Sequence, residues 1–315
     1  MEEQKKGDIA VIKLAPKNIG KKETHNRSNS TISKKSGSKE FKNTFKIKLE
    51  DLVANERNDN KIKIENSNKE VSRAHFKYNY IIGKGGFGKV WAVELKKTQK
   101  IYAMKEMMKT KIIGKKSIRS VLNERELLSN IKHPFIINMN YAFQDRDHLY
   151  LVMDLLVGGD LRYHMGRRRK FKESEAKFFI ACIILGLEPM HLNNIIHRDI
   201  KPENIVFDDK GYLRVSDLGI ARVVKPDNSA DTSGTPGYMA PEVMCRQDHS
   251  FPVDYYAVGV IAYELMLGRR PYFGRNRKEI RDHILSKQVK VEDPPEGWSY
   301  EAVDFVNRVY HLLFS

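Results

Sequence analysis

Residues 197–204 read His-Arg-Asp-Ile-Lys-Pro-Glu-Asn, and a second motif, Asp-Leu-Gly, occupies residues 217–219. Phosphoryl transfer needs a carboxylate that orients a hydroxyl group and takes its proton, and Asp199 fits this role. It also needs hard oxygen ligands for Mg²⁺, which the side chains of Asn204 and Asp217 supply. An Asp and an Asn at this spacing are common by chance, whereas the eight residues in this order are highly specific.

A glycine-rich turn precedes these motifs in the chain. Residues 83–90, Gly-Lys-Gly-Gly-Phe-Gly-Lys-Val, stand between apolar residues 76–82 and 90–95, a pattern that predicts strand, turn and strand. Glycines let backbone N–H groups approach phosphates because no Cβ stands in the way. Dinucleotide-binding folds also use such glycines, but they place a helix after them and an acidic residue about 20 residues on. Here a β-type segment follows, which favours a phosphate-binding hairpin.

Lys105 lies in the next apolar stretch, seventeen residues after Gly88. We expect its ammonium group to hold the α- and β-phosphates of a nucleotide whose adenine lies between Val90 and Ala103. A lone ammonium group needs an anchor to stay in register over phosphates. The sequence therefore predicts an acidic partner for Lys105 elsewhere in the chain.

Glu124 is the predicted partner of Lys105. Residues 117–130 predict a helix, with apolar residues at 118, 121, 122, 127 and 128, and Glu124 projects from it. A glutamate in a charged helix often only faces solvent, which is the interpretation we favour for Glu126. For Glu124 we predict an ion pair with Lys105, because residues 122–125 and Leu128 match the pattern of a protein family that the chain resembles.

From about Phe76 to its end, the chain resembles a eukaryotic protein kinase domain. Lys201, two residues after Asp199, follows the pattern of kinases that act on Ser or Thr, and it would neutralise the phosphoryl group in transit. Within that superfamily the chain is most similar to the AGC group, the relatives of cyclic-nucleotide-dependent kinases. Residues 151–154, 158–160 and 234–242 carry this similarity.

The resemblance implies an α+β, two-lobed protein-kinase-like fold. A small β-rich N-lobe with one main helix would cover residues 76–153, and a larger, mostly helical C-lobe would cover residues 158–315. Residues 76–315 are long enough to bury the core of such a domain. The implied cofactors are ATP and Mg²⁺, with Asn204 and Asp217 at the metal. The implied nucleotide-binding residues are Ile82, Gly83, Gly85, Gly88, Val90, Ala103, Lys105, the gatekeeper Met153, the hinge from Asp154 to Leu156, Asp160 and Val206.

Further structural roles follow from the same resemblance. Thr235 would contact Asp199 and Lys201 and favour hydroxyl acceptors. Asp254 would support the backbone of the catalytic loop. A regulatory spine is implied, made of Leu128, Met139, His197 and Leu218, where Leu218 replaces the usual Phe and still fills an apolar position.

Three carboxylates predict which protein substrates the chain accepts. Asp160, Glu203 and Glu264 match positions where basophilic AGC kinases bind Arg or Lys before the acceptor residue. Charge-assisted hydrogen bonds are about twice as strong as neutral ones, so local acids can outweigh a diffuse basic field. Alternatively, Asp160 serves only the ribose, and Glu203 and Glu264 only support the structure. We expect Ser/Thr substrates near basic residues.

The activation segment departs from the family at its phosphorylation position. Four residues before Thr235 stands Asp231, followed by Thr232 and Ser233, where Arg198 would ordinarily bind a phosphate. Aspartate brings one negative charge, against about 1.5 to 2 for a phosphate. One hypothesis is that Asp231 partly substitutes for phosphorylation. The competing hypothesis is that Thr232 is the phosphorylation site, displaced by one residue.

Two further departures concern the C-lobe. Pro189 falls late in a predicted helix from about residue 174 to 192, where an interior Pro costs about 3 kcal/mol, so we expect a kink or an early helix end. The sequence stops at Ser315, where the family continues into a last helix whose Arg pairs with Glu242. We therefore expect an incomplete C-lobe, in which an unpaired Glu242 is destabilising by several kcal/mol.

Residues 1–75 differ in character from the rest. They carry eighteen Lys and Arg against eleven Asp and Glu, with few aromatics, a composition typical of a disordered tail. Two alternatives are docking to an anionic membrane or nucleic acid, and self-regulation through Arg27-Ser28-Asn29-Ser30. The whole chain has a net charge of +16.

The remaining composition bears on location. Two cysteines, Cys182 and Cys245, predict no disulfide framework and a reducing intracellular compartment, cytoplasmic or nuclear. The sequence shows neither a signal peptide nor an apolar run long enough to cross a bilayer. The oligomeric state is not set by the sequence.

Two functional classes follow. The first is an active ATP- and Mg²⁺-dependent protein serine/threonine kinase, favoured because the full catalytic set is present: Lys105, Glu124, Asp199, Lys201, Asn204 and Asp217. The second is a non-catalytic nucleotide-binding or interaction module, which only the expected incomplete C-lobe favours.

Overall fold

The computed structural model describes residues 71–168, 170–287 and 289–311. These residues fall within one compact unit. Residues 1–70 of the predicted basic tail lie outside the described residues, and so does the segment Arg27-Ser28-Asn29-Ser30. Residues 312–315 are also outside them, so the predicted incompleteness of the C-lobe stays a prediction.

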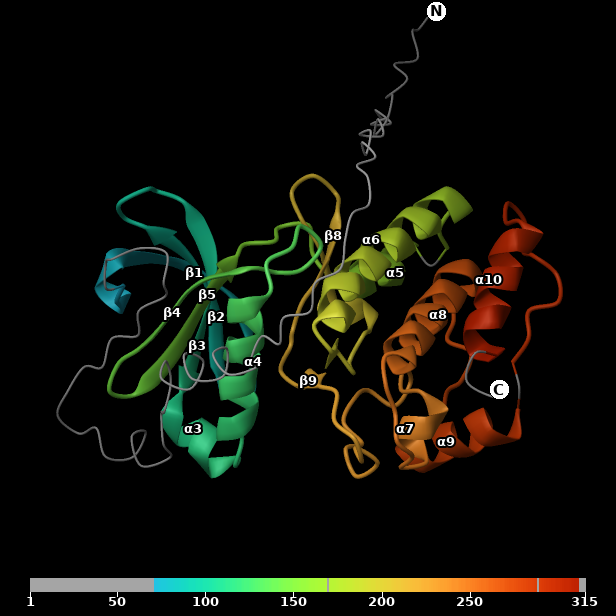
Figure 1. Cartoon of the computed structure of the whole chain (residues 1–315). Coiled ribbons are helices and arrows are strands. Elements are labelled where there is room, and N and C mark those ends of the chain that lie inside the picture. Colours follow the sequence, from blue (N-terminus) through green and yellow to red (C-terminus); the bar gives the residue numbers. More distant parts are fainter. Residues whose placement is uncertain (1–70, 169, 288, 312–315) are drawn as a thin grey trace, which may run out of the picture. The chain divides into compact units, whose positions relative to one another are not determined.

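The N-lobe is built on a five-stranded antiparallel sheet with the strand order β1-β2-β3-β5-β4 (Figure 1). The predicted glycine-rich hairpin is formed by the first two strands, and Gly85 N donates to Gly88 O at 2.9 Å across its turn. A Cβ at Gly88 would collide with the backbone carbonyl of Glu106 on the neighbouring strand, so only glycine fits there. The strands are β1 (Phe76–Lys84), β2 (Gly88–Leu95), β3 (Ile101–Met108), β4 (Met139–Gln144) and β5 (His148–Asp154), preceded by the 3-10 turn η1 (Arg73–His75).

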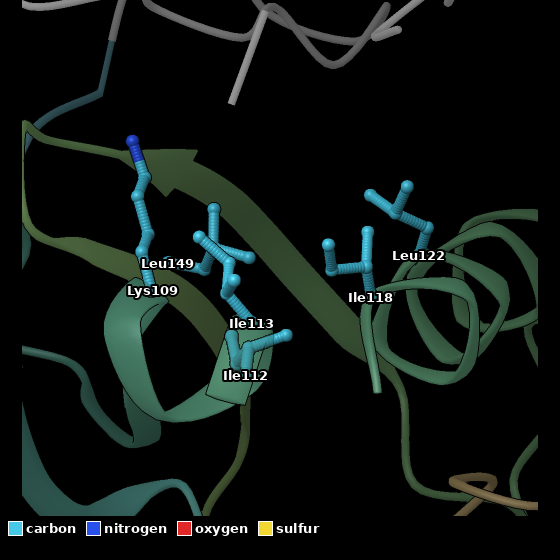
Figure 2. A pocket seen from close by; sticks show the side chains of 6 residues that line it. All are labelled: Lys109, Ile112, Ile113, Ile118, Leu122 and Leu149. Atoms are coloured by element: carbon cyan, nitrogen blue, oxygen red, sulfur yellow. The ribbon is translucent and has the colours of Figure 1, made fainter. Parts of the chain in front are cut away.

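Two helices lie beside this sheet, α3 (Lys109–Gly114) and α4 (Ile118–Asn130). The observed α4 agrees with the helix predicted for residues 117–130. Its apolar residues Val121, Leu127 and Leu128 are buried in a core shared with Met107 on β3. A small apolar pocket lies between the two helices and β5, as Figure 2 shows, and its lining residues are Lys109, Ile112, Ile113, Ile118, Leu122 and Leu149.

The C-lobe is mostly helical, with short two-stranded pairs near the catalytic motifs. Helix α8 is buried along nearly its whole length; it begins at a Pro and ends at Gly268, whose φ of 72° closes the helix. None of the helices described is both long and apolar enough to cross a membrane. The helices are α5 (Leu161–Arg168), α6 (Glu173–Leu192), α7 (Pro241–Met244), α8 (Pro252–Leu267), α9 (Arg277–Ser286) and α10 (Tyr300–His311), with the 3-10 turn η2 (Pro202–Asn204). The short strands are β6 (Ile195–Ile196), β7 (Ile205–Phe207), β8 (Leu213–Val215) and β9 (Arg222–Val223).

Helix α6 runs through Pro189 to Leu192, so the predicted early helix end is wrong. A Pro removes the hydrogen bond to the carbonyl four residues earlier, and only three helical residues follow Pro189. The bond that is lost is the one to the carbonyl of Leu185, and the last turn still continues to Leu192. The Asn193 side chain then closes that turn, since its Nδ2 donates to Pro189 O at 2.7 Å.

Candidate active site

Lys105 and Glu124 form the predicted ion pair. Lys105 Nζ lies 2.7 Å and 3.0 Å from the two carboxylate oxygens of Glu124. Strand β3 supplies the lysine and helix α4 the glutamate, whose residue is only 4% exposed. Burial acts to lower the pKa of Lys105, but the negative charges of Glu124 and Asp217 outweigh it and raise that pKa. The lysine is thus held as a fixed positive charge.

The ion pair faces a pocket whose wall is the glycine-rich turn. Seven predicted site residues line this pocket together: Gly85, Gly88, Val90, Lys105, Glu124, Asp199 and Asp217. A positive charge, several glycine backbones and two carboxylates therefore meet in one cavity. This combination suits a nucleotide phosphate chain with a bound divalent cation.

The catalytic loop brings Asp199, Lys201, Thr235 and Asn204 together. The Thr235 hydroxyl donates to Asp199 Oδ1 at 2.6 Å. Lys201 Nζ donates to Asp199 Oδ2 at 2.7 Å and to Thr235 Oγ1 at 2.9 Å. Asn204 Nδ2 donates to the Asp199 backbone carbonyl at 2.9 Å and to Oδ2 at 3.1 Å. The predicted contacts of Thr235 with Asp199 and Lys201 are both present.

Asp254, on the first turn of α8, holds the backbone of this loop as predicted. Its carboxylate accepts hydrogen bonds from His197 N at 2.9 Å and from Arg198 N at 2.8 Å. His191 Nε2 lies 2.9 Å from the same carboxylate. Arg198 has a φ of 68°, a conformation that non-glycine residues rarely adopt. Asp254 therefore holds the loop in an unfavourable backbone shape.

The side chains that could supply oxygen ligands to a divalent cation are those of Asn204 and Asp217. The Asn204 amide nitrogen is used inside the loop, and its side-chain oxygen Oδ1 accepts no hydrogen bond from the described residues. Asp217 has a φ of 61°, and its Oδ1 accepts from Gly219 N at 3.3 Å. Within the described ranges, no cluster of three His, Cys, Asp or Glu could hold a metal alone. Two hard oxygen ligands with open positions fit Mg²⁺ bound together with phosphates.

The predicted spine residues are buried and close together. Leu128, Met139 and Leu218 belong to one apolar cluster. His197 is fully buried, and its Nε2 bonds to Ser216 O at 3.0 Å. Leu218 thus fills the apolar position expected of it.

Apart from Val90, the predicted adenine-side residues do not line the phosphate pocket. Ala103 pairs with Met153 across β3 and β5, and Asp160 forms a bridge with Val206. Asp160 Oδ1 accepts from Tyr163 N at 2.8 Å at the start of α5, so this carboxylate also has a structural role. The remaining predicted residues outside that lining are Ile82, Gly83, Asp154 and Leu156.

Asp231 forms an ion pair with Arg198, the residue predicted to bind a phosphate in this family. The Arg198 side chain is only 4% exposed, whereas that of Asp231 is 39% exposed. Burial acts to raise the pKa of Asp231, but the bond to Arg198 outweighs it and holds that pKa below its usual value. Thr232 is half-buried beside it, and its backbone carbonyl accepts from Arg277 Nη2 at 3.1 Å.

Glu203 and Glu264, predicted to bind a basic substrate residue, are both bound by Arg162 of this chain. Arg162 Nε donates to Glu203 Oε1 at 2.9 Å, and Nη1 donates to Glu264 Oε1 at 2.7 Å. The Tyr238 hydroxyl donates to Glu264 Oε2 at 2.5 Å. Glu203 and Glu264 therefore have the structural role that the sequence analysis gave as the alternative to substrate binding.

Glu242 has no partner for one carboxylate oxygen. Its Oε2 is buried and accepts no hydrogen bond within the described part of the chain. Burial raises the pKa of this carboxyl group above its ordinary value. The predicted unpaired acid is thus present among the described residues.

Three side chains near the pocket were not predicted from the sequence. Ser120 Oγ bonds to Gly219 O, and Asn123 Nδ2 donates to Ala221 O at 2.8 Å. Ser120 lies four residues before Glu124 and so shares its helix face, which is a signal that could have identified it. Lys115 Nζ donates to Gly86 O at 3.1 Å and contacts the ring of Phe87 at the hairpin tip.

A two-lobed fold with this ion pair, catalytic loop and Asp-Leu-Gly motif defines a protein kinase domain. Residues 76–313 match the family described as the protein kinase domain, and the chain belongs to this family.

Curated relatives agree with this assignment. A probable serine/threonine-protein kinase of Dictyostelium discoideum is 42% identical over 73% of this chain and 50% of its own length. Human serine/threonine-protein kinase 32B is 44% identical over 65% of this chain and 51% of its own length. Serine/threonine-protein kinase Sgk1 of Danio rerio is 39% identical over 72% of this chain and 53% of its own length. The chain spans about half the length of the curated relatives it matches.

Proposed function

We propose that the chain transfers the γ-phosphate of ATP, bound with Mg²⁺, to Ser or Thr hydroxyl groups of protein substrates. One observation carries this proposal. Lys105, Glu124, Asp199 and Asp217 line a single pocket under the glycine-rich turn. The similarity to serine/threonine kinases supports the choice of acceptor.

The residues present fit both ATP and Mg²⁺. Lys105, fixed by Glu124, would hold the α- and β-phosphates, and the backbone of residues 85–88 would cover them. Asn204 and Asp217 would hold the metal through their free oxygens. When bound, Mg·ATP supplies the phosphoryl group and the charge that offsets its negative oxygens.

Asp199 orients the acceptor and receives its proton. In the structure, Oδ1 of Asp199 accepts a hydrogen bond from a hydroxyl group, that of Thr235, at 2.6 Å. A substrate hydroxyl would approach the same carboxylate in the same way, beside the pocket that Asp199 lines. Lys201 lies 2.7 Å from Asp199 and would stabilise negative charge on the group in transit.

We further propose that Asp231 provides part of the charge that phosphorylation supplies in this family. Its ion pair with the buried Arg198 supports this role, because Arg198 also donates to Ile220 O at 2.8 Å, close to the Asp-Leu-Gly motif. The charge on Asp231 is thus linked through one side chain to the metal-binding segment. Phosphorylation of Thr232 is the competing proposal.

The location and partners are proposals of the same kind. An intracellular location suits a protein that uses ATP and keeps two free thiols, Cys182 and Cys245. Contact of the basic tail with an anionic membrane or nucleic acid rests on its charge alone.

The experiment that tests the main proposal measures transfer of labelled phosphate from Mg·ATP to a Ser/Thr peptide mixture. The chain as written is compared with Asp199→Asn, and ATP binding is measured for both. We expect transfer by the first protein only and equal ATP binding by both. ATP binding without transfer by either would favour the non-catalytic module, to which the unpaired Glu242 also points.

A further inference from the structure

Arg162, the second residue of α5, lies at Glu203 and Glu264, the carboxylates that the sequence predicted to bind a basic substrate residue. Its guanidinium group contacts Glu203, both oxygens of Glu264 and the Tyr238 hydroxyl. Glu264 is only 7% exposed, so Arg162 and Tyr238 bind a carboxylate that is largely shielded from water. The planar guanidinium group satisfies that carboxylate with two parallel bonds.

Few free carboxylate oxygens therefore remain at Glu203 and Glu264 for a basic substrate residue to bind. Both oxygens of Glu264 are already used, by Arg162 and Tyr238. Glu203 keeps one oxygen without a partner among the described residues, but a substrate guanidinium placed there would lie beside that of Arg162. Two like charges at such a distance repel each other, which offsets the attraction to Glu203.

A second arginine lies on the same face without an acidic partner. Arg270 follows the end of α8 and lies against Gly237, so closely that a Cβ at Gly237 would collide with its guanidinium group. The guanidinium carbon is 5.9 Å from the centre of the Tyr238 ring. No carboxylate of the described residues forms an ion pair with Arg270, which is half-buried. Its charge is therefore available to another molecule.

The position of Arg270 relates to the acceptor through Thr235. Because Thr235 donates to Asp199 at 2.6 Å, the two residues that follow it, Pro236 and Gly237, lie beside the place of the acceptor hydroxyl. A side chain that flanks the acceptor in a substrate would thus approach Arg270. Arg277 adds a further positive charge, since it donates to Thr232 O at 3.1 Å on the same segment.

We propose that this kinase domain selects substrates with an acidic side chain next to the acceptor Ser or Thr, which Arg270 binds while Arg162 neutralises Glu203 and Glu264, two of the three carboxylates that would select a basic residue. The proposal rests on the proposed kinase function and names the substrate class of that same site. It replaces the preference for basic sequences that the three carboxylates predicted.

The test uses the full chain and three peptides that differ only around one Ser. One peptide has neutral flanking residues, one has Arg residues before the Ser, and one has Asp or Glu on either side of it. We expect kcat/KM to be about tenfold higher for the acidic than for the basic peptide, the size of one favourable charged contact. The ratio, rather than the rate, is the readout, because a general structural defect lowers all three values together.

Two substitutions of Arg270 and a matched control show whether Arg270 causes the preference for the acidic peptide. Arg270→Gln should lower the acidic-to-basic ratio about fivefold, and Arg270→Glu should reverse it. Arg269→Gln removes the same charge from the adjacent exposed residue and should leave the ratio unchanged. Arg162→Gln, which retains hydrogen-bonding groups toward Glu264, should raise kcat/KM for the basic peptide.

The outcomes separate this inference from the proposed function. A higher kcat/KM for the basic peptide, or a ratio that Arg270→Glu does not change, would overturn the acidic preference while leaving the kinase function intact. Transfer to none of the peptides and to no residue of the chain itself, with ATP bound, would contradict the kinase function and this inference with it.

Discussion

The carboxylates that contact or belong to the catalytic loop differ in their hydrogen bonds from those of the neighbouring segment that runs from Asp231 to Glu242. Asp254 contacts two backbone amides and His191, and Asp199 contacts Lys201, Asn204 and Thr235. In the second segment, Asp231 has its ion pair with Arg198 at a partly exposed position, and Glu242 has a buried oxygen without a donor among the described residues.

The difference shows which part of the site is fixed by the fold. Buried carboxylates with several donors have one low-energy arrangement, because each lost bond leaves a desolvated charge. Asp231 has two contacts, with Arg198 and with Ser233 Oγ at 3.1 Å, but its carboxylate is partly exposed, so water can replace them at a lower cost. The catalytic loop is therefore set once the chain folds, whereas the Asp231–Glu242 segment responds to its charge state.

The largest expected effect comes from the fixed region. Asp199→Asn should lower kcat by about a hundredfold or more, because removal of a general base costs roughly 10²–10⁴ in rate. Its hydrogen-bonded neighbours keep a partner of the same shape, so the thermal midpoint should change little. Retention of more than a tenth of the wild-type rate would show that Asp199 does not receive the proton.

Glu124→Gln should lower kcat by about ten- to a hundredfold. A hydrogen bond to a charged group contributes about 1.5–3 kcal/mol, and its loss releases Lys105 from its place over the phosphates. Glu126→Gln in the same helix is the matched control, since Glu126 is exposed, and its rate should equal that of the wild type. Equal losses in the two variants would contradict the anchoring role.

Asp231→Ala should lower the basal rate by about three- to tenfold, while Thr232→Ala should leave it unchanged. The pH profile sharpens the comparison. Since the pKa of Asp231 is lowered, its charge persists at neutral pH, and its contribution to stability is lost only as pH falls below about 4, through the folded-state pKa. A phosphate at Thr232 would instead titrate near pH 6.

Basal kcat measured between pH 5.5 and 8 on the protein as isolated, with the phosphate content of Thr232 determined by mass spectrometry, decides between the two. A profile without a transition near pH 6, together with a loss in Asp231→Ala alone, supports Asp231 as the source of the charge. A loss confined to Thr232→Ala would reject that hypothesis.

The smallest effect concerns Glu242, and it is on stability rather than rate. Because burial raises the pKa of Glu242, the folded state binds its proton more tightly than the unfolded state does. Its stabilising contribution is thus present below about pH 4.5, the ordinary glutamate value, and is lost as pH rises through the folded-state pKa. Glu242→Gln should raise the free energy of unfolding at pH 7 by about 1 kcal/mol, since it removes a buried charge that lacks a donor.

Chemical denaturation at pH 4 and pH 7 measures this difference. The gain should be seen at pH 7 and should disappear at pH 4. Glu296→Gln, at an exposed position, is the control and should change neither value. A loss of stability in Glu242→Gln at pH 7 would mean that the charged form has a favourable partner.

Much of the site could be predicted because its residues form short motifs with fixed spacing. The distances between Asp199, Lys201 and Asn204 are set by one loop, and Glu124 could be assigned because the neighbouring residues of one helix match the family pattern. In each case the local pattern determines where the side chain points. The strand-turn-strand around Gly85 and Gly88 was predictable for the same reason.

The role of Arg162 could not be predicted in this way. It contacts Glu203 and Glu264, which are 41 and 102 residues away in the sequence. Nothing local distinguishes an Arg that turns toward a buried carboxylate from one that faces solvent. The early helix end predicted from Pro189 was wrong, because the helix continues for three residues beyond it to Leu192.

The support that Asp254 gives to the catalytic loop has a consequence for solvent exchange. Loop amides usually exchange their hydrogens rapidly, because brief local openings expose them to water. The amides of His197 and Arg198 instead donate to a carboxylate that is 1% exposed. Their release requires α8 to separate from the loop, so these two amides should exchange as slowly as those in the middle of α8. The residues that carry the chemistry would then belong to the last part of the molecule to open.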